Sequence, residues 1–168
     1  MNLFLLDARP QISATYHTDK HVVKMVLETA QILCSAHWIC DGYVGEGWYA
    51  LTHKNHPVVQ WCASSLGAYK YSYAQFKWLA YEYKYRFKRD HLSWVKFGSV
   101  LNEPPDFIPH INTRQYIMAM PEKYWPIGAM SRLTDIRSAV LAYRRYYRGD
   151  KYHLFTWTNR QVPEWVLS

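Results

Sequence analysis

The stretch SATYHTDKHVVKMVLETAQILCSAHWIC occupies residues 13–40 and contains neither proline nor glycine. Its apolar residues return every three or four positions, at Val22, Val23, Val26, Leu27, Ala30, Leu33 and Ala36. That interval is the period of an α-helix with one apolar face. Ser13 is a suitable N-cap, and Asp41-Gly42 suits the end of a helix. The stretch therefore predicts a long first helix over residues 13–40.

Three further segments carry helical patterns. A long central helix is expected over residues 57–89, because Pro57 suits a first helical turn and Asn55 or His56 could cap it. Gly67 is a possible soft point in that helix. A short helix is expected over residues 91–101, and a last one from residue 131 or 134 to residue 148. Residues 3–6 suit a short strand or an extended lead-in. Strand signals are weak throughout, so the expected fold is all-α.

The length of the chain, 168 residues, suits one domain with a real core. Charged residues make up 20% and hydrophobic residues 49%, as in ordinary globular proteins. A single compact helical domain is therefore expected over residues 1–168. Residues 102–127 predict a long surface loop of the kind that often carries function, because five prolines fall there: Pro104, Pro105, Pro109, Pro121 and Pro126.

The charge and the aromatic content point to an anionic partner. The formal net charge is +7, and lysines and arginines gathered on one face release counterions when they bind phosphates. Aromatic residues make up 17% of the chain, which is more than a core of this size needs. Some rings should therefore lie at the surface beside basic residues, where they could stack on bases. Nucleic acid or a nucleotide is the favoured partner, and the alternatives are a generally basic surface or a membrane surface.

The cysteines and the N-terminus predict a cytoplasmic protein. Three cysteines cannot all pair, and Cys34, Cys40 and Cys62 show no CxxC spacing, which indicates a reducing compartment. The apolar run at residues 3–6 lacks a basic start, and Asp7 ends it too early for a signal peptide. No run approaches the roughly 18 apolar residues of a membrane span, so no membrane association is expected.

Five polar residues fall in one row on the first predicted helix: His17, His21, Lys24, Glu28 and Gln31. The positions i, i+4, i+7, i+11 and i+14 share one helix face. Two histidines, a lysine and an acid on one face suit proton transfer, because neighbouring charges tune their pKa values. The alternative interpretation is an ordinary solvent-facing row.

A second cluster, His53-Lys54-Asn55-His56, precedes the central helix. Backbone N–H groups at a helix start attract anions, and these side chains would suit a phosphate or a sugar hydroxyl. The alternative is helix capping by Asn55 beside solvated histidines. A zinc site using His17 and His21, or His53 and His56, with Glu28 is a weaker option. Its spacing matches no strong signature, so neither a metal nor another cofactor is expected.

A third motif alternates arginine and tyrosine near the end of the last predicted helix. Arg144, Arg145 and Tyr146 could combine phosphate contacts with a stacking platform. Tyr143 and Tyr147 could instead belong to the core, which would leave only the arginines solvated. Nucleic-acid binding is the favoured interpretation.

Residues 19–33 read DKHVVKMVLETAQIL, and Asn55-His56-Pro57 and a tyrosine-rich helix containing Glu82 follow. Together these features resemble the pyrimidine-dimer DNA glycosylase family, of the phage endonuclease V type. The likeness covers residues 1–90, roughly the first half of the chain. It implies a compact all-α domain that flips a base out of the duplex.

The resemblance also implies a mechanism. A free N-terminal amine attacks the sugar C1′ and forms a Schiff base, and a glutamate on the first helix handles the proton and assists strand cleavage. Glu28 matches that glutamate by its spacing from Asp19 and His21. His21 and His56 match further family positions.

Two features depart from the family pattern. Asn2 is too large for the usual removal of the initiator methionine, so the amine would belong to Met1. The arginine beside the family glutamate, which grips DNA, is replaced by Leu27. Lys20 or Lys24 could supply an alternative amine if burial lowered its pKa.

Two functions of different classes follow. The first is a DNA N-glycosylase with possible abasic-site lyase activity on damaged or modified bases. The second is a protein that binds a nucleotide without turnover, for example a phage protein that sequesters a small signalling nucleotide. The surplus of aromatic, histidine and arginine side chains suits a stacking pocket with phosphate clamps.

Overall fold

The computed structural model describes residues 1–113 and 115–167, and within these ranges it contains seven α-helices and one pair of two-residue strands. The all-α fold is confirmed. The helices are α1 (Pro10–Tyr16), α2 (Asp19–Asp41), α3 (Pro57–Ala63), α4 (Leu66–Phe87), α5 (Leu92–Phe97), α6 (Ile136–Asp150) and α7 (Glu164–Leu167). Short 3-10 turns lie at Val100–Asn102, Glu122–Tyr124 and Tyr152–Leu154.

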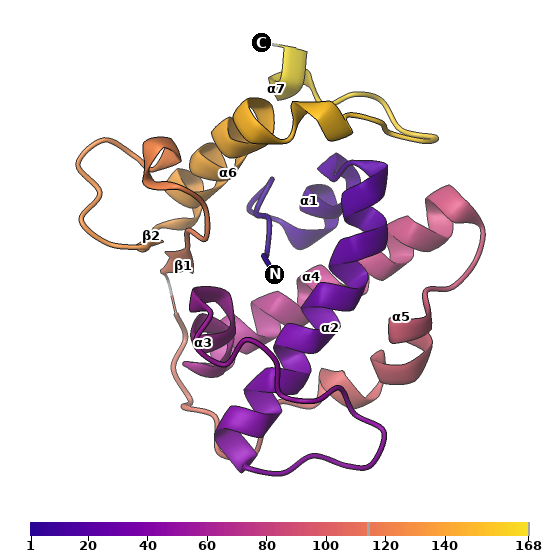
Figure 1. The fold of residues 1–168 in the computed structure, drawn as a ribbon, viewed down its shortest axis with the longest axis vertical. Coiled ribbons are helices and arrows are strands. Elements are labelled where there is room, and N and C mark those ends of the chain that lie inside the picture. Colours follow the sequence, from indigo (N-terminus) through magenta and orange to yellow (C-terminus); the bar gives the residue numbers. More distant parts are fainter. Residues whose placement is uncertain (114, 168) are drawn as a thin grey trace.

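The N-terminal segment lies between α2 and α6, near the middle of the molecule (Figure 1). Residues 3–6 form neither helix nor strand, and all four side chains are buried. The ring of Phe4 packs on His21 of α2 and on Tyr143 and Tyr147 of α6. The start of the chain is therefore built into the core, which fixes the position of the residues before it.

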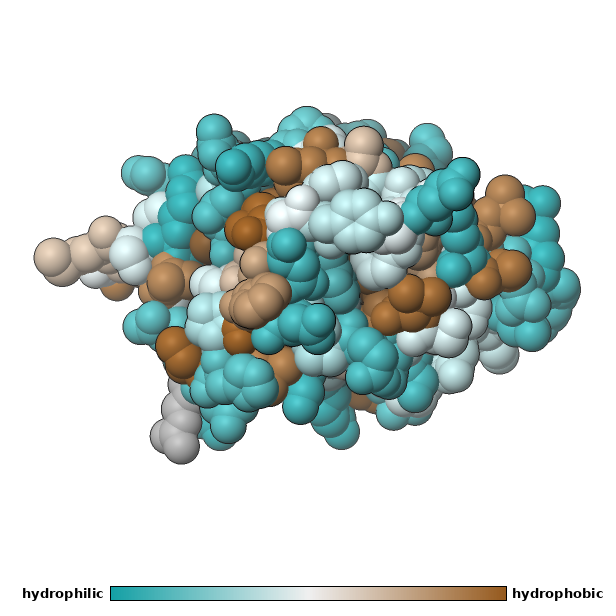
Figure 2. All heavy atoms as spheres, turned by 90° about the horizontal axis from the view of Figure 1, so that it is seen from below, coloured by the Kyte–Doolittle hydropathy of each residue, from teal (hydrophilic) through white to brown (hydrophobic). Residues whose placement is uncertain are grey.

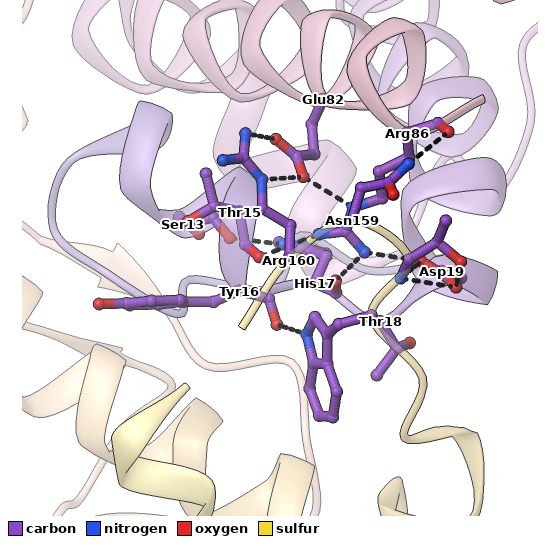
Figure 3. Close-up of polar contacts among 12 residues, drawn as sticks. Ser13, Thr15, Tyr16, His17, Thr18, Asp19, Glu82, Arg86, Asn159 and Arg160 are labelled. Atoms are coloured by element: carbon purple, nitrogen blue, oxygen red, sulfur yellow. Dashed lines mark hydrogen bonds and ion pairs between the residues drawn. The ribbon is translucent and has the colours of Figure 1, made fainter. Parts of the chain in front are cut away.

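The first helix begins later than its pattern predicted. Residues 13–40 do not form one helix, because α1 ends at Tyr16 and α2 begins at Asp19. Arg86 of α4 donates hydrogen bonds of 2.9 Å to the carbonyl oxygens of Thr15 and His17 (Figure 3). These two carbonyls therefore bond to a guanidinium at the corner where α1 gives way to α2. At its other end α2 stops as predicted, with Gly42 in the left-handed conformation at φ 72°.

A buried ionic network holds this corner to the rest of the fold. Arg86 contacts Glu82 at 2.7 Å and Asp19 at 2.9 Å, and its side chain is fully buried. Arg160 from the C-terminal segment binds both carboxylate oxygens of Glu82, at 2.9 and 2.7 Å (Figure 3). Asp19 accepts the backbone N–H and the hydroxyl of Thr158. The network thus joins α1, α2, α4 and the tail.

The predicted central helix is two helices. Residues 57–89 divide into α3 and α4 at Ser64 and Ser65. Ser65 has an extended backbone, and its hydroxyl caps α4 by accepting the N–H of Ala68 at 3.2 Å. Gly67 is not the break, but a Cβ there would lie 2.7 Å from the backbone nitrogen of Thr113. Its small size allows residues 109–113 to cross the start of α4.

The proline-rich segment over residues 102–127 is a surface loop only in part, because about half of its described residues are exposed and others are buried. Ile108, Ile117, Met118 and Met120 are buried in the core. The strand β1 (Tyr116–Ile117) pairs antiparallel with β2 (Leu133–Thr134), with Tyr116 opposite Thr134. Prolines excluded helix here, but buried apolar side chains still hold the segment against α3 and α6.

The remaining helices follow the predictions with shifted ends. The short α5 spans Leu92–Phe97, within the predicted 91–101. The last long helix, α6, starts at Ile136 because Asp135 caps it, accepting the N–H groups of Arg137 and Ser138. Tyr143 and Tyr147 are fully buried, as the core interpretation of that motif required.

Hydrophilic and apolar side chains alternate over the face seen from below, without one broad apolar patch (Figure 2). Within the part of the chain that the structure describes, no helix combines the length and the apolar character needed to cross a bilayer.

Candidate functional site

The structure brings the first residue and Glu28 together. The amino nitrogen of Met1 lies 3.7 Å from Oε2 of Glu28, and the same oxygen accepts the backbone N–H of Asn2 at 3.1 Å. The other carboxylate oxygen lies 3.2 Å from Nζ of Lys24, one turn earlier on α2. Only 8% of Glu28 is exposed. A carboxylate and two amines therefore meet at the edge of the core, as proton transfer requires.

Asn2 fixes the amine in this position. Its side-chain amide donates to the carbonyl of Ala119 at 2.9 Å, and its Oδ1 accepts the N–H of Leu3 at 2.7 Å. The hydroxyl of Tyr143 lies 3.1 Å from the same Oδ1. Asn2 is 9% exposed, so these bonds form in a largely dry environment. The sequence indicates only that Asn2 is large. Its role in anchoring the terminus depends on Ala119 and Tyr143, which lie more than a hundred positions away.

A cavity of about 340 Å³ lies next to residues that contact the N-terminus, although neither Met1 nor Glu28 is among the residues that line it. Its walls come from the start of α3, from the segment after β1 and from the residue before β2: His56, Pro57, Ala119, Met120, Pro121 and Arg132. Ala119 connects the cavity with the terminus through its bond to Asn2. The proline-rich segment thus supplies half of the lining, although it does so as a packed wall.

His56 lines the cavity, and the charge of the Met1 amine acts on its pKa. Burial is the main cause that lowers its pKa, and the positive charges of the Met1 amine and His53 lower it further. Its Nδ1 accepts the N–H of Val58 at 3.2 Å, which requires that nitrogen to be unprotonated. The other ring nitrogen of neutral His56 takes no part in the helix cap. His56, and not Asn55, caps α3.

Arg132 adds a positive charge at the cavity. Its guanidinium donates to the carbonyl of Met118 at 3.4 Å and lies 5.2 Å from the ring of Trp125. The side chain is exposed, so it can reach a phosphate or a base edge. Sequence reasoning missed Arg132, because no local pattern distinguishes it from the other surface arginines.

Two histidines of the predicted row lie in the core instead. His17 falls between α1 and α2, where its Nδ1 donates to the carbonyl of Ser13 at 2.8 Å. His21 stacks on Phe4, and its Nδ1 lies 2.5 Å from the hydroxyl of Tyr147. Burial lowers the pKa of His17 to about 4 and that of His21 to about 3. Both imidazoles are neutral at physiological pH, and His21 lies two helical turns, about 10 Å, from Glu28 along α2.

The five polar residues predicted to form one row on the first helix therefore lie in different environments. Lys24 and Glu28 meet at the terminus, Gln31 is half-buried further along α2, and the histidines pack inside. Lys20, at the start of α2, is exposed. The interpretation of the whole row as a solvent face does not hold for the residues that are buried.

The cluster before α3 is exposed except at His56. His53, Lys54 and Asn55 lie on the surface, and the Lys54 carbonyl accepts the side chain of Gln60 at 2.7 Å. They sit next to the cavity along the chain but do not line it. The N–H of Val58 is taken by His56, which leaves one fewer donor for an anion.

Most side chains of the arginine and tyrosine motif of α6 pack on other parts of the chain and do not face solvent. Arg144 donates to the carbonyl of Leu6 at 2.8 Å and lies 3.5 Å from Asp7. Tyr146 packs on Phe4 and Tyr124, so it offers less stacking surface than its position suggested. Arg145 is exposed. Only one of these three predicted binding residues therefore points fully to solvent.

Among the described residues, no three histidine, cysteine, aspartate or glutamate side chains approach closely enough to hold a metal ion. Comparison of the chain with models of known families, with curated proteins and with solved structures gave no match.

Proposed function

We propose that the protein is a DNA N-glycosylase with associated abasic-site lyase activity. The observation that carries the proposal is the Met1 amine held 3.7 Å from the Glu28 carboxylate, next to Asn2, which bonds to a wall residue of the cavity of about 340 Å³. An amine nucleophile needs a neighbouring group that takes its proton, and a carboxylate at this distance suits that role. The resemblance of residues 19–33 to the pyrimidine-dimer glycosylases supports the same pair.

In the proposed reaction, the lone pair of the Met1 nitrogen forms a bond to C1′ of the sugar. The glycosidic bond to the base breaks, and the base leaves with the bonding electron pair and a proton. Glu28 takes the proton that the attacking nitrogen loses. The nitrogen lone pair then forms the Schiff-base double bond to C1′ as the C1′–O4′ bond breaks, and Glu28 returns its proton to O4′. Glu28 next takes a C2′ proton, a double bond forms between C2′ and C3′, and the 3′ phosphate leaves with the electron pair of the C3′–O bond.

The surrounding residues suit the needs of this sequence of steps. Asn2 holds the nitrogen in place through its bonds to Ala119 and Leu3, which reduces the entropy lost on reaction. Neutral His56 is placed to exchange a proton with the departing base. Exposed Arg132 is placed to pair with a phosphate of the DNA strand.

Borohydride trapping tests the proposal directly, because reduction of the Schiff base locks protein and DNA together. A duplex with one abasic site and a duplex with a thymine dimer serve as substrates, after mass spectrometry has established that the chain begins at Met1. We expect a covalent adduct that maps to the Met1 peptide and that disappears when the amine is acetylated.

Matched variants identify the amine that reacts. Lys24→Gln should still form the adduct, since Lys24 contacts Glu28 but is not the nucleophile. An adduct on Lys20 or Lys24 would contradict the role of Met1, and no adduct on either substrate would contradict the enzyme itself.

The alternative function is nucleotide binding without turnover. The observation that favours it is Arg132, which lines the cavity and whose guanidinium lies 5.2 Å from the ring of Trp125, because a cation at this position suits the phosphate of a nucleotide. Under this alternative, the protein retains a nucleotide stoichiometrically and releases it chemically unchanged. Recovery of a cleaved product would exclude it.

A further inference from the structure

The outer face of α4 carries lysine and tyrosine side chains in one row. We call this row the α4 stripe: Lys70, Lys77, Tyr81, Lys84, Tyr85 and Lys88. The steps of seven, four and three between Lys70, Lys77, Tyr81 and Lys84 keep them on one helix face. Lys88 follows as the C-cap of α4, with a left-handed backbone at φ 57°. At a rise of 1.5 Å per residue, the stripe is about 27 Å long. None of these residues lines the cavity at His56 and Arg132.

Two rings of the stripe remain open to solvent. Tyr81 and Tyr85 are each 44% exposed, whereas Tyr69, Tyr143 and Tyr147 are almost completely buried. The sequence predicted exposed rings beside basic residues and assigned them to α6. The structure shows such an arrangement on α4, where the rings lie one helical turn apart.

Cations lie close to both exposed rings. Nζ of Lys77 is 5.8 Å from the centre of the Tyr81 ring, and Nζ of Lys88 is 5.0 Å from that of Tyr85. The guanidinium of Arg160 lies 3.9 Å from the centre of the Tyr85 ring. Contacts of this kind orient aromatic rings and cations together.

Few acids offset this charge. The one acidic residue within α4 is Glu82, which is buried and bound by Arg86 and Arg160. Asp90 pairs with Lys84 at 3.1 Å, but both side chains are exposed, and such a pair contributes little. Lys84 can therefore exchange Asp90 for a phosphate at small cost.

A cleft of about 230 Å³ opens beside the rings, lined in part by Trp78, Tyr81, Tyr85 and Arg160. It places a concave aromatic surface next to the row of lysines. A planar ring entering the cleft would meet aromatic side chains and the Arg160 guanidinium together.

We propose that the α4 stripe binds single-stranded nucleic acid, with the lysines on phosphates and with Tyr81 and Tyr85 stacked on bases. A single strand presents unstacked bases to such rings, whereas a duplex keeps its bases stacked within the helix. The proposal goes beyond the glycosylase site, which lies at the N-terminus and involves different residues.

The electrostatic part is tested with a fluorescein-labelled oligomer of twenty thymidylates, whose affinity is measured by anisotropy over a range of salt concentrations. The variant Lys77→Gln/Lys84→Gln/Lys88→Gln should weaken binding at low salt about tenfold or more. It should also lower the slope of log affinity against log salt by about 2, because each phosphate contact on a single strand contributes about 0.7. Lys96→Gln/Lys123→Gln/Arg137→Gln removes the same charge from exposed positions elsewhere and is the matched control.

The stacking part is tested with Tyr81→Leu/Tyr85→Leu, which keeps apolar side chains at both positions. We expect affinity to fall about tenfold with the salt slope unchanged, since stacking involves no counterion release. As a second measurement, an oligomer carrying 5-iodouracil should photo-crosslink to Tyr81 or Tyr85.

Three results would overturn the proposal. The first is an equal loss of affinity in the charge-matched control, and the second is equal competition by duplex DNA or by poly-glutamate. The third is a photo-crosslink confined to residues outside α4. Glu28→Gln should leave oligomer binding intact, so failure of the stripe and failure of the glycosylase proposal are distinguishable.

Discussion

Glu28 and Glu82 are both buried carboxylates, but they differ in the cations that meet them. Glu82 is held by Arg86 and by both ends of the Arg160 fork, at 2.7 to 2.9 Å, and 3% of its side chain is exposed. Glu28 is met by the Met1 amine at 3.7 Å and by Lys24 at 3.2 Å, and 11% of its side chain is exposed.

The difference lies in what each cation can do. A guanidinium stays protonated at any accessible pH, so the pairs around Glu82 are permanent. An amine, in contrast, can lose its proton, so the pairs around Glu28 need not be permanent. Arginines thus bind the carboxylate at the corner between α1 and α2, whereas amines contact the carboxylate at the N-terminus.

The largest expected effect comes from the variant Arg86→Met, which removes a permanently charged guanidinium that binds Glu82. Glu82 and the carbonyls of Thr15 and His17 would remain buried without their partner. We expect the free energy of unfolding to fall by about 3–5 kcal/mol, measured by urea denaturation. Arg137→Met on the exposed side of α6 is the control, with a change within about 0.5 kcal/mol. A loss under about 1 kcal/mol for Arg86→Met would contradict the structural role.

Acid should weaken the same corner through its buried histidines. Burial lowers the pKa of His17 to about 4 and of His21 to about 3, below the ordinary value of 6.5 that applies to the unfolded chain. Between these values the unfolded chain binds more protons, so stability is fully present above pH 6.5 and is lost as the pH falls. Each histidine should cost roughly 2–3 kcal/mol by pH 4. Thermal melts from pH 7 to pH 4 measure this loss.

The variant His21→Leu separates the two histidines. Leucine keeps an apolar contact with Phe4 and removes one titrating group. The loss of stability between pH 7 and pH 4 should therefore be smaller in the variant. An identical pH dependence would show that His21 does not contribute.

The Glu28 side should show the smallest effect on stability. Glutamine keeps the size of the side chain and an oxygen for the N–H of Asn2, so Glu28→Gln should change the unfolding free energy by less than about 1 kcal/mol. In the same preparation, borohydride trapping should fall at least about 100-fold. Glu46→Gln, in the exposed loop after α2, is the matched control and should leave both unchanged. If Glu28→Gln strongly lowered the free energy of unfolding but left trapping unchanged, Glu28 would be a structural carboxylate like Glu82, and the comparison would be wrong.

Local sequence patterns predicted the all-α class of the fold more accurately than they predicted where its helices begin and end. The spacing of Val22, Val26, Ala30 and Leu33 marks buried positions, and α2 forms there, although Val23 and Leu27 of the same pattern are exposed. Val140 and Tyr143 are likewise buried on α6. The breaks at residues 17–18 and 64–65 have no such pattern. The first lies where Arg86 binds two carbonyls from another helix, and the second follows from the extended backbone of Ser65.

For the candidate site, the sequence determined which residue types are present, and the tertiary structure determined which of them contact one another. Glu28, Lys24 and His56 could be proposed from helical spacing, a helix entry and a resemblance. Their meeting with Met1 depends on the burial of residues 3–6 and on the bond between Asn2 and Ala119, across 117 positions. The same packing took His21 into the core. A one-dimensional pattern reports which face of a helix is polar, but burial and long-range hydrogen bonds decide which polar group faces a cavity.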